Sequence, residues 1–100
     1  MALNNSYSVA KSIDDYGILS IMYHRFDENK YPSTNIRLNE FKLHLDLIEK
    51  KKYKFISHKE FQMSIKEKNP QKKILLTIDD GFSSFYKNAW PILKKKEIPF

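Results

Sequence analysis

Residues 73–82 read KILLTIDDGF, and this stretch decides the fold more than any other part of the chain. Residues 73–78 are mostly apolar, which predicts a strand buried in a sheet. The apolar run stops abruptly at Asp79-Asp80-Gly81, where a turn is expected. A helix should follow, from Ser83 or Ser84 to Lys96. Its apolar face would consist of Phe85, Ala89, Ile92 and Leu93.

Two prolines refine this prediction. Pro91 should kink the helix or mark the start of its main part, because proline lacks the backbone N–H that a helix interior needs. After the helix, Ile98-Pro99-Phe100 has the pattern of the beginning of another strand. Residues 73–100 therefore predict a strand, a turn, a helix and the start of a strand, which is typical of α/β proteins.

The same alternation is found toward the amino terminus. Residues 17–24 (GILSIMYH) are nearly all apolar after the glycine, which predicts a strand buried on both faces. Residues 25–38 form a long polar loop, and long loops in compact domains are often functional. Asn39 is placed to cap a helix that runs to about Lys51. Its inner face would consist of Leu38, Phe41, Leu45 and Ile48.

A second strand and helix follow. Residues 53–57 (YKFIS) predict a short strand, and Ser57-His58-Lys59-Glu60 matches a capping box, which predicts a helix start. Phe61 and Ile65 would face inward, and Asn69-Pro70 would end the segment. Strands and helices thus alternate along the whole chain, which predicts an α/β fold with a parallel sheet.

Composition excludes several classes of protein. The chain has 100 residues and no cysteine, so disulfide scaffolds, cysteine-ligated zinc and thiol catalysis are ruled out. It holds no apolar run long enough to span a membrane, and its start lacks the pattern of a secretory signal. Residues 1–16 are expected to be a leader or irregular extension, and residues 17–100 the folded part. The compartment is left open.

Basic residues outnumber acidic ones, which gives a net charge of +6. Nearly all of them are lysine, with Arg25 and Arg37 the two exceptions, and lysine is the poorer ligand for bases and phosphates. We therefore expect no nucleic-acid partner. The densest runs, residues 50–52 and 94–96, fall where the predicted helices end and would complement the helix dipoles. A polyanion-binding patch is the alternative interpretation.

Chemical groups follow two of the predicted strands. Tyr23 and His24 come after one strand, and Asp79 and Asp80 after another. The carboxyl ends of parallel strands share one edge of a sheet, which is where α/β active sites lie. Adjacent carboxylates repel unless a cation neutralises them, so one can bind a divalent metal such as Zn²⁺ while the other handles a proton.

Each of these residues also has a purely structural interpretation. Asp-Asp-Gly can be a simple turn with Gly81 at positive φ, and His24 can be a hydrogen-bonded rim residue. His44 and His58 are expected on the surface, away from the strand ends. Trp90 and the phenylalanines are expected in the core rather than as a sugar-binding platform.

The motif Leu75-Leu76-Thr77-Ile78-Asp79-Asp80-Gly81-Phe82 resembles the first motif of the polysaccharide deacetylases, the NodB-homology or carbohydrate esterase 4 family, which reads Thr-Phe-Asp-Asp-Gly-Tyr. Residues 86–95 resemble the family's next helix, and residues 98–100 its next strand. Residues 21–26 (IMYHRF) look like the opening strand of the exopolysaccharide deacetylase branch, which includes poly-N-acetylglucosamine deacetylases. The resemblance covers residues 18–100.

This resemblance implies the amino-terminal part of a distorted (β/α) barrel that removes N-acetyl groups from a polysaccharide with the help of a divalent metal, Zn²⁺ in the first place. It implies that Asp79 is the general base and Asp80 a metal ligand. His24 would be an active-site neighbour that holds substrate or orients a carboxylate. Ile78 and Phe82 depart from the family motif, and Phe82 lacks the hydroxyl of the family's tyrosine.

The largest departure concerns the remaining ligands. The family's later His-(Ser/Thr)-x-x-His motif occurs nowhere in this sequence, and a (β/α) barrel needs about 200 residues or more. We therefore expect an incomplete deacetylase domain, with little or no activity as an isolated chain, because a tight zinc site needs three protein ligands. Alternatives are a non-catalytic glycan-binding or self-associating half-barrel, and an unrelated doubly wound domain whose acidic pair binds Mg²⁺.

Overall fold

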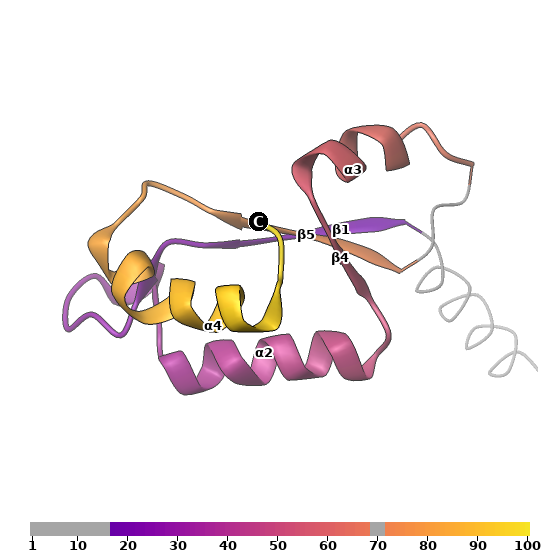
Figure 1. Ribbon diagram of the computed structural model, residues 1–100. Coiled ribbons are helices and arrows are strands. Elements are labelled where there is room, and N and C mark those ends of the chain that lie inside the picture. The colour runs from indigo at the N-terminus through magenta and orange to yellow at the C-terminus, as the bar shows by residue number, and fades with distance from the viewer. Residues whose placement is uncertain (1–16, 69–71) are drawn as a thin grey trace, which may run out of the picture.

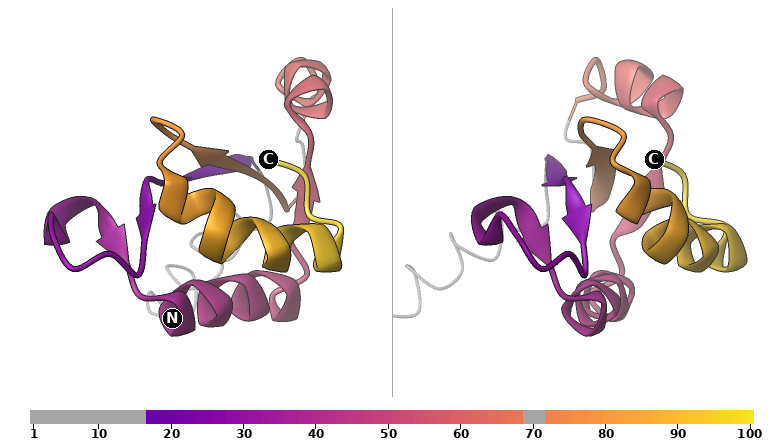
Figure 2. Two further views of the ribbon diagram at one scale, coloured as in Figure 1. Left: turned by 60° about the vertical axis from the view of Figure 1, so that its left-hand side comes forward. Right: turned by 90° about the vertical axis from the view of Figure 1, so that its left-hand side faces the viewer.

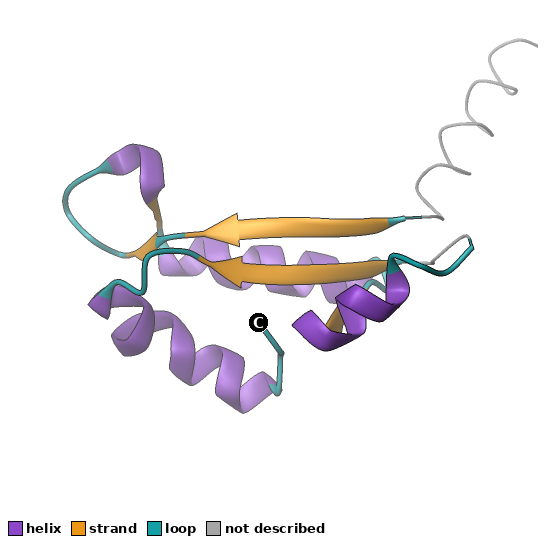
Figure 3. Ribbon diagram, turned by 90° about the horizontal axis from the view of Figure 1, so that it is seen from above, coloured by secondary structure: helices purple, strands orange, loops and turns teal. Residues whose placement is uncertain are grey.

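A computed structural model describes residues 17–68 and 72–100 of the chain. Its centre is a three-stranded sheet in which β5 (Lys73–Ile78) lies between β1 (Ile18–Tyr23) and β4 (Lys54–Ile56). Both neighbours are parallel to β5, and Figure 3 shows β1 and β5 side by side with the same direction. The predicted α/β fold with parallel strands is confirmed. The predicted leader, residues 1–16, lies outside the described residues.

The helices cover both faces of this sheet (Figure 1, Figure 2). α2 (Leu38–Lys50) and α4 (Trp90–Lys96) lie on one side, and α3 (His58–Ser64) lies on the other. The last strand in the chain takes the central place in the sheet, so the order in space, β1-β5-β4, differs from the order in the sequence. None of the helices in residues 17–68 and 72–100 is long and apolar enough to cross a membrane.

The core lies where β1 and β5 meet α2 and α4. Six of its side chains are completely buried: Phe26, Phe41, Leu45, Leu76, Ala89 and Leu93. Phe41 and Leu45 are the centre of the predicted inner face of α2, and Leu38 and Ile48 at its ends are partly buried. The three- and four-residue spacing of this helix therefore predicted its buried face correctly.

The start of α2 differs from the prediction. Arg37, not Asn39, occupies the N-cap position, and Asn39 lies within the first turn of the helix. The Leu38 N–H donates instead to Oδ1 of Asp27, at 2.9 Å. A carboxylate from the preceding loop thus satisfies one of the free N–H groups of the first helical turn, which local sequence rules do not reveal.

β1 is an edge strand, and the prediction that it is buried on both faces is wrong. The side chains of Leu19 and Met22 are 51% and 57% exposed. Only one edge of β1 pairs within the described residues, and α2 and α4 cover one face of the strand. A central strand and an edge strand can have the same short run of apolar residues, so the sequence pattern does not show which of the two a strand will be.

α3 begins as predicted but its inner face does not match. The Ser57 hydroxyl accepts the Glu60 N–H at 3.1 Å, which confirms half of the predicted capping box. Phe61 is partly buried, but Ile65 is 57% exposed, because the helix ends at Ser64 and Ile65 falls on its C-cap. The predicted break at Asn69-Pro70 lies outside the described residues.

The helix after Asp79-Asp80-Gly81 is interrupted by a π-helical turn, η2 (Phe85–Ala89), and continues as α4. Pro91 stands in the first turn of α4, which confirms that it marks the start of the main helix. The predicted strand at residues 98–100 does not form. The Ile98 N–H donates to the Leu93 carbonyl and so ends the helix instead of joining a sheet.

The two lysine runs end α2 and α4, as predicted from the helix dipoles. Lys50 is the last residue of α2, and residues 94–96 form the last turn of α4. Nζ of Lys96 lies 3.5 Å from Oδ1 of Asp46 and 3.9 Å from Oε1 of Glu49, both on α2. The carboxyl ends of the two helices therefore lie at the same end of the molecule.

Candidate active site

The carboxyl ends of β1 and β5 bring His24 and Asp79 together. Tyr23 lies opposite Ile78 in the parallel register, so the residues that follow them are neighbours. The Asp79 N–H donates to the Tyr23 carbonyl at 2.8 Å, and His24 Nε2 lies 3.9 Å from Asp79 Oδ2. Both side chains remain partly exposed, at 25% for His24 and 44% for Asp79. The predicted shared edge is confirmed, and the catalytic roles of the two residues remain predictions.

The turn after β5 is tight. Asp80 and Gly81 have φ angles of 69° and 58°, both in the left-handed region, which glycine adopts freely and aspartate tolerates better than most residues. Asp80 is exposed, and its carboxylate bonds to no residue that the structure describes. Asp79 and Asp80 are therefore in different surroundings, since one faces His24 and the other faces solvent.

The donors at this edge of the sheet are too few for a complete metal site. No group of three or more histidine, cysteine, aspartate or glutamate side chains in residues 17–68 and 72–100 is arranged to hold a metal ion. Near the strand ends, His24 and Asp79 supply two donors that already face each other. A zinc site takes at least three protein ligands, so the described residues do not complete one.

The side chain of Tyr23 packs this edge of the sheet against α2. Its ring is buried and meets Phe41 edge-on, with ring centroids 5.0 Å apart. Its hydroxyl lies 2.7 Å from Nδ1 of His44 on α2. Burial raises the pKa of Tyr23 to about 12, so the hydroxyl is protonated at neutral pH and can donate to the imidazole.

The contact between Tyr23 and His44 was not predicted. His44 is exposed, as expected, but the expectation that it lies away from the strand ends is wrong, because its Nδ1 bonds to the hydroxyl of Tyr23, the last residue of β1. Its place three residues after Phe41 was the available signal. His58 is exposed in the first turn of α3, as predicted. Trp90 is partly buried and packs against Phe100, with ring centroids 5.7 Å apart. Phe100 itself is 46% exposed, so the expectation that the phenylalanines lie in the core is wrong for this residue, which ends the chain beyond the last helix.

A polar network joins the loop after β1 to the helix after β5. The loop contains β2 (Arg25–Phe26), a 3₁₀ turn η1 (Pro32–Thr34) and β3 (Asn35–Ile36), and β2 pairs with β3. Arg25 donates to Glu28 Oε1 at 3.0 Å, and Ser84 donates to Glu28 Oε2 at 2.6 Å. The hydrogen bond from Ser84, with the charge of Arg25, lowers the pKa of Glu28.

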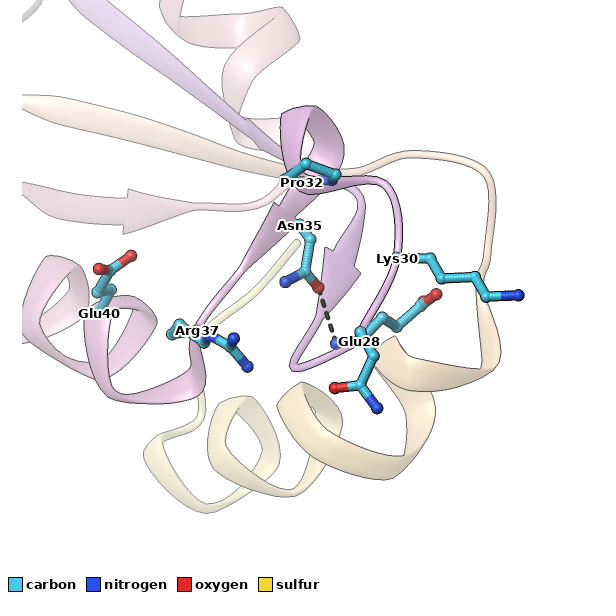
Figure 4. A pocket seen from close by; sticks show the side chains of 7 residues that line it. Glu28, Lys30, Pro32, Asn35, Arg37 and Glu40 are labelled. Carbon is cyan, nitrogen blue, oxygen red and sulfur yellow. Dashed lines mark hydrogen bonds between the residues drawn. The ribbon is translucent and has the colours of Figure 1, made fainter.

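Two shallow hollows border this loop. One of about 250 Å³ is shown in Figure 4, and its wall includes Glu28, Lys30, Asn35, Arg37 and Glu40. Asn35 Oδ1 accepts the Glu28 N–H there, at 2.9 Å. A smaller hollow of about 140 Å³ has His24 in its wall, together with Ser33 and Thr34. The smaller hollow is the one beside the candidate site, because it includes His24.

Comparison with known proteins agrees with these features. No protein-family model matches the chain. A protein from Bacillus subtilis named as the putative polysaccharide deacetylase YxkH is 31% identical over 77 residues, which cover 75% of this chain and 27% of that protein. The solved structure of IcaB from Ammonifex degensii superposes with a TM-score of 0.75 at 32% identity and covers 85% of this chain. The described residues therefore have the fold of part of the IcaB structure.

The chain spans about a third of these relatives, 27% of the Bacillus protein and 36% of the IcaB chain.

Proposed function

We propose, on the premise that this chain resembles part of the polysaccharide deacetylases, that it contributes the strand edge at which the N-acetyl groups of a polysaccharide are removed by hydrolysis. The two relatives and the parallel α/β fold support the general class. The observation that carries the proposal is the meeting of His24 and Asp79, 3.9 Å apart, at the carboxyl edge of β1 and β5. Active sites of α/β proteins occur at such edges.

Asp79 acts in this proposal as the general base. A water molecule attacks the carbonyl carbon of the acetamide group, and the Asp79 carboxylate accepts the proton that the water loses. The bond between carbon and nitrogen then breaks as the nitrogen takes up a proton from an acid outside the described residues, and Asp79 afterwards releases its proton to the solvent. The products are acetate and a free amino group on the sugar. Asp79 is suited to this role because its carboxylate is 44% exposed and therefore accessible to water.

His24 and Asp80 would have supporting roles. His24 faces the Asp79 carboxylate and is placed to orient it or to contact the substrate. Asp80 would supply one carboxylate of a divalent-metal site, Zn²⁺ by resemblance to the family, whose other ligands lie outside the described residues. Such an ion, when bound, would polarise the carbonyl and lower the pKa of a bound water.

The test compares three single variants in the complete protein that carries residues 1–100, with an N-acetylated oligosaccharide as substrate and acetate release as the measurement. Asp79→Asn should lower kcat about 100-fold or more, because a general base contributes about 10²–10⁴ to the rate. Glu67→Gln is the matched control, since Glu67 is an exposed carboxylate that pairs with Lys73 at the other end of β5. Full activity of Asp79→Asn would exclude Asp79 as the base.

Asp80→Asn separates the two carboxylates. If Asp80 contributes to a metal site, this variant loses activity and regains part of it at raised Zn²⁺ concentration, whereas Asp79→Asn is not rescued. The isolated 100-residue chain should release little or no acetate under the same conditions. Robust deacetylation by that chain would show that residues 1–100 suffice, contrary to this prediction.

A second candidate function is self-association through β1. One edge of this strand forms no pairing within residues 17–68 and 72–100, and Leu19 and Met22 are more than half exposed beside it. An open edge of this kind pairs readily with another chain. Sedimentation velocity distinguishes the cases: a dimer that Met22→Lys abolishes supports self-association, and a monomer at 100 μM excludes it.

A further inference from the structure

We propose that Arg25 and Glu28 are positioning residues for the turn Asp79-Asp80-Gly81. Arg25 contacts Phe82 and Glu28 bonds to Ser84, and both of these contacts lie just after the turn. The catalytic part of this proposal rests on the proposed function, whereas the structural part does not. The turn has few attachments of its own. The Asp79 N–H donates to the Tyr23 carbonyl, but Asp80 and Gly81 are exposed, and neither forms a hydrogen bond to the other residues that the structure describes.

Arg25 holds the residue that follows the turn. The Cζ atom of its guanidinium lies 3.7 Å from the centroid of the Phe82 ring, and 4.4 Å from that of Tyr31 on its own loop. A planar cation over an aromatic face is attracted by the ring, more strongly where water is excluded. The side chain of Arg25 is 18% exposed, so the contact is largely shielded. Phe82 is thereby fixed to the loop after β1.

The orientation of the guanidinium is itself constrained. Nε donates to Thr34 Oγ1 at 3.2 Å, and one terminal nitrogen donates to Glu28 Oε1 at 3.0 Å. Lysine could supply the charge at this position but neither the flat surface nor the fork of donors. These engaged donors favour a positioning role for Arg25 over direct contact with a substrate.

Glu28 holds the helix that starts after the turn. Its Oε2 accepts the Ser84 hydroxyl at 2.6 Å, and Ser84 Oγ in turn accepts the Phe26 N–H at 3.1 Å. Ser84 is buried, so this bond is protected from solvent. Asn88 adds a third connection, because its Nδ2 donates to the Phe26 carbonyl at 2.8 Å.

These contacts surround a turn in which one residue has an unfavourable backbone conformation. Asp80, at φ 69°, and Gly81, at φ 58°, lie between the last bond of the ladder and the start of the helix, and the left-handed region is costly only for Asp80. The surrounding contacts help to hold Asp80 in that conformation. The ladder bond of Asp79 fixes one side of the turn, and the contacts of Phe82 and Ser84 fix the other. The position of both carboxylates therefore depends on residues that come more than fifty positions earlier in the chain.

The test uses the two arginines of the chain. Arg25→Lys keeps the charge and removes the stacking plane, and Arg37→Lys is the matched control at the exposed N-cap of α2. Backbone ¹⁵N relaxation is measured on each full chain. We expect order parameters at Asp80 and Gly81 to fall from about 0.85 toward 0.6 in Arg25→Lys and to stay unchanged in Arg37→Lys.

A second variant protects the test against a simple loss of folding. Phe82→Leu retains an apolar side chain but removes the ring, and it should loosen the same two residues. In both variants the amides of Leu75 and Leu76, in the middle of β5, should keep their chemical shifts. Unchanged order at Asp80 and Gly81, an equal effect of Arg37→Lys, or a loss of order that extends into β5 would each overturn the proposal.

The catalytic consequence has its own measurement. In the complete protein, Arg25→Lys should lower kcat about tenfold or more with little change in KM, because it displaces the reacting groups without touching the substrate. Glu28→Gln should also lower kcat, because its single amide oxygen can accept from Ser84 or from Arg25 but not from both. If the unaltered protein releases no acetate, the proposed function fails, and the relaxation data still decide whether Arg25 holds the turn.

Discussion

The hydroxyl of Tyr23 provides a sharp test of the structure, because the difference in stability between Tyr23→Phe and the unaltered chain should change sign with pH. Tyr23→Phe removes the hydrogen bond of 2.7 Å to His44 Nδ1 and leaves the buried ring in place. At pH 8 this variant should be less stable than the unaltered chain by about 1 kcal/mol, the usual net contribution of such a bond. For a domain of this size that corresponds to about 4–8 °C in Tm.

At alkaline pH, Tyr23→Phe should become more stable than the unaltered chain. The pKa of Tyr23 is raised to about 12 in the folded chain, compared with about 10 in the unfolded chain. A raised pKa means that its stabilisation is complete below pH 10 and is lost as the pH rises toward 12. A shift of two pKa units corresponds to a loss of about 2.7 kcal/mol of stability, which exceeds the contribution of about 1 kcal/mol from the hydrogen bond. Tyr23→Phe should therefore be the more stable protein at pH 12.

The assay is urea unfolding followed by far-UV circular dichroism at pH 8, 10, 11 and 12 for both proteins. The lysines and the other tyrosines titrate in the same range, but they are common to both chains and cancel in the difference. His44→Ala serves as the control, since it removes the partner and keeps the phenol. A difference between the two proteins that stays constant from pH 8 to pH 12 would refute the burial of the Tyr23 hydroxyl.

Three further predictions concern the fold and are measured by the same unfolding assay. Phe41→Ala, which empties a fully buried site between two aromatic rings, should cost about 3–5 kcal/mol and leave the chain largely unfolded at 25 °C. Ser57→Ala should cost about 1 kcal/mol, because it removes the oxygen that caps α3. Asp27→Ala should cost about as much, because the Leu38 N–H loses its acceptor, whereas Asn39→Ala should be neutral or stabilising.

The sequence predicted those features that depend on local pattern. The strand and turn of residues 73–81 were clear because an apolar run ends at two carboxylates and a glycine. The inner face of α2 followed from the spacing of Phe41 and Leu45. The meeting of His24 and Asp79 followed from the rule that parallel strands share a carboxyl edge, once both strands were identified.

Features that depend on distant parts of the chain could not be predicted. The exposure of Met22 depends on the position of β1 at the edge of the sheet, which periodicity does not encode. The network of Arg25, Glu28 and Ser84 joins residues separated by 56 positions. The long loop after β1 was predicted to be a functional segment, but its contacts with Ser84 and Asn88, in the helix after the turn, were not predicted. In each case the missing information was tertiary contact.

The common direction of α2 and α4 has an electrical consequence. Their carboxyl ends place residues 50–52 and 94–96 at one end of the molecule, whereas Asp79 and Asp80 lie at the opposite end of the strands. The chain therefore carries a permanent charge asymmetry along the sheet. On a negatively charged support such as a cation-exchange resin or mica, it should adsorb through its lysines. The carboxyl edge of the strands would then point away from the support, open to molecules in solution.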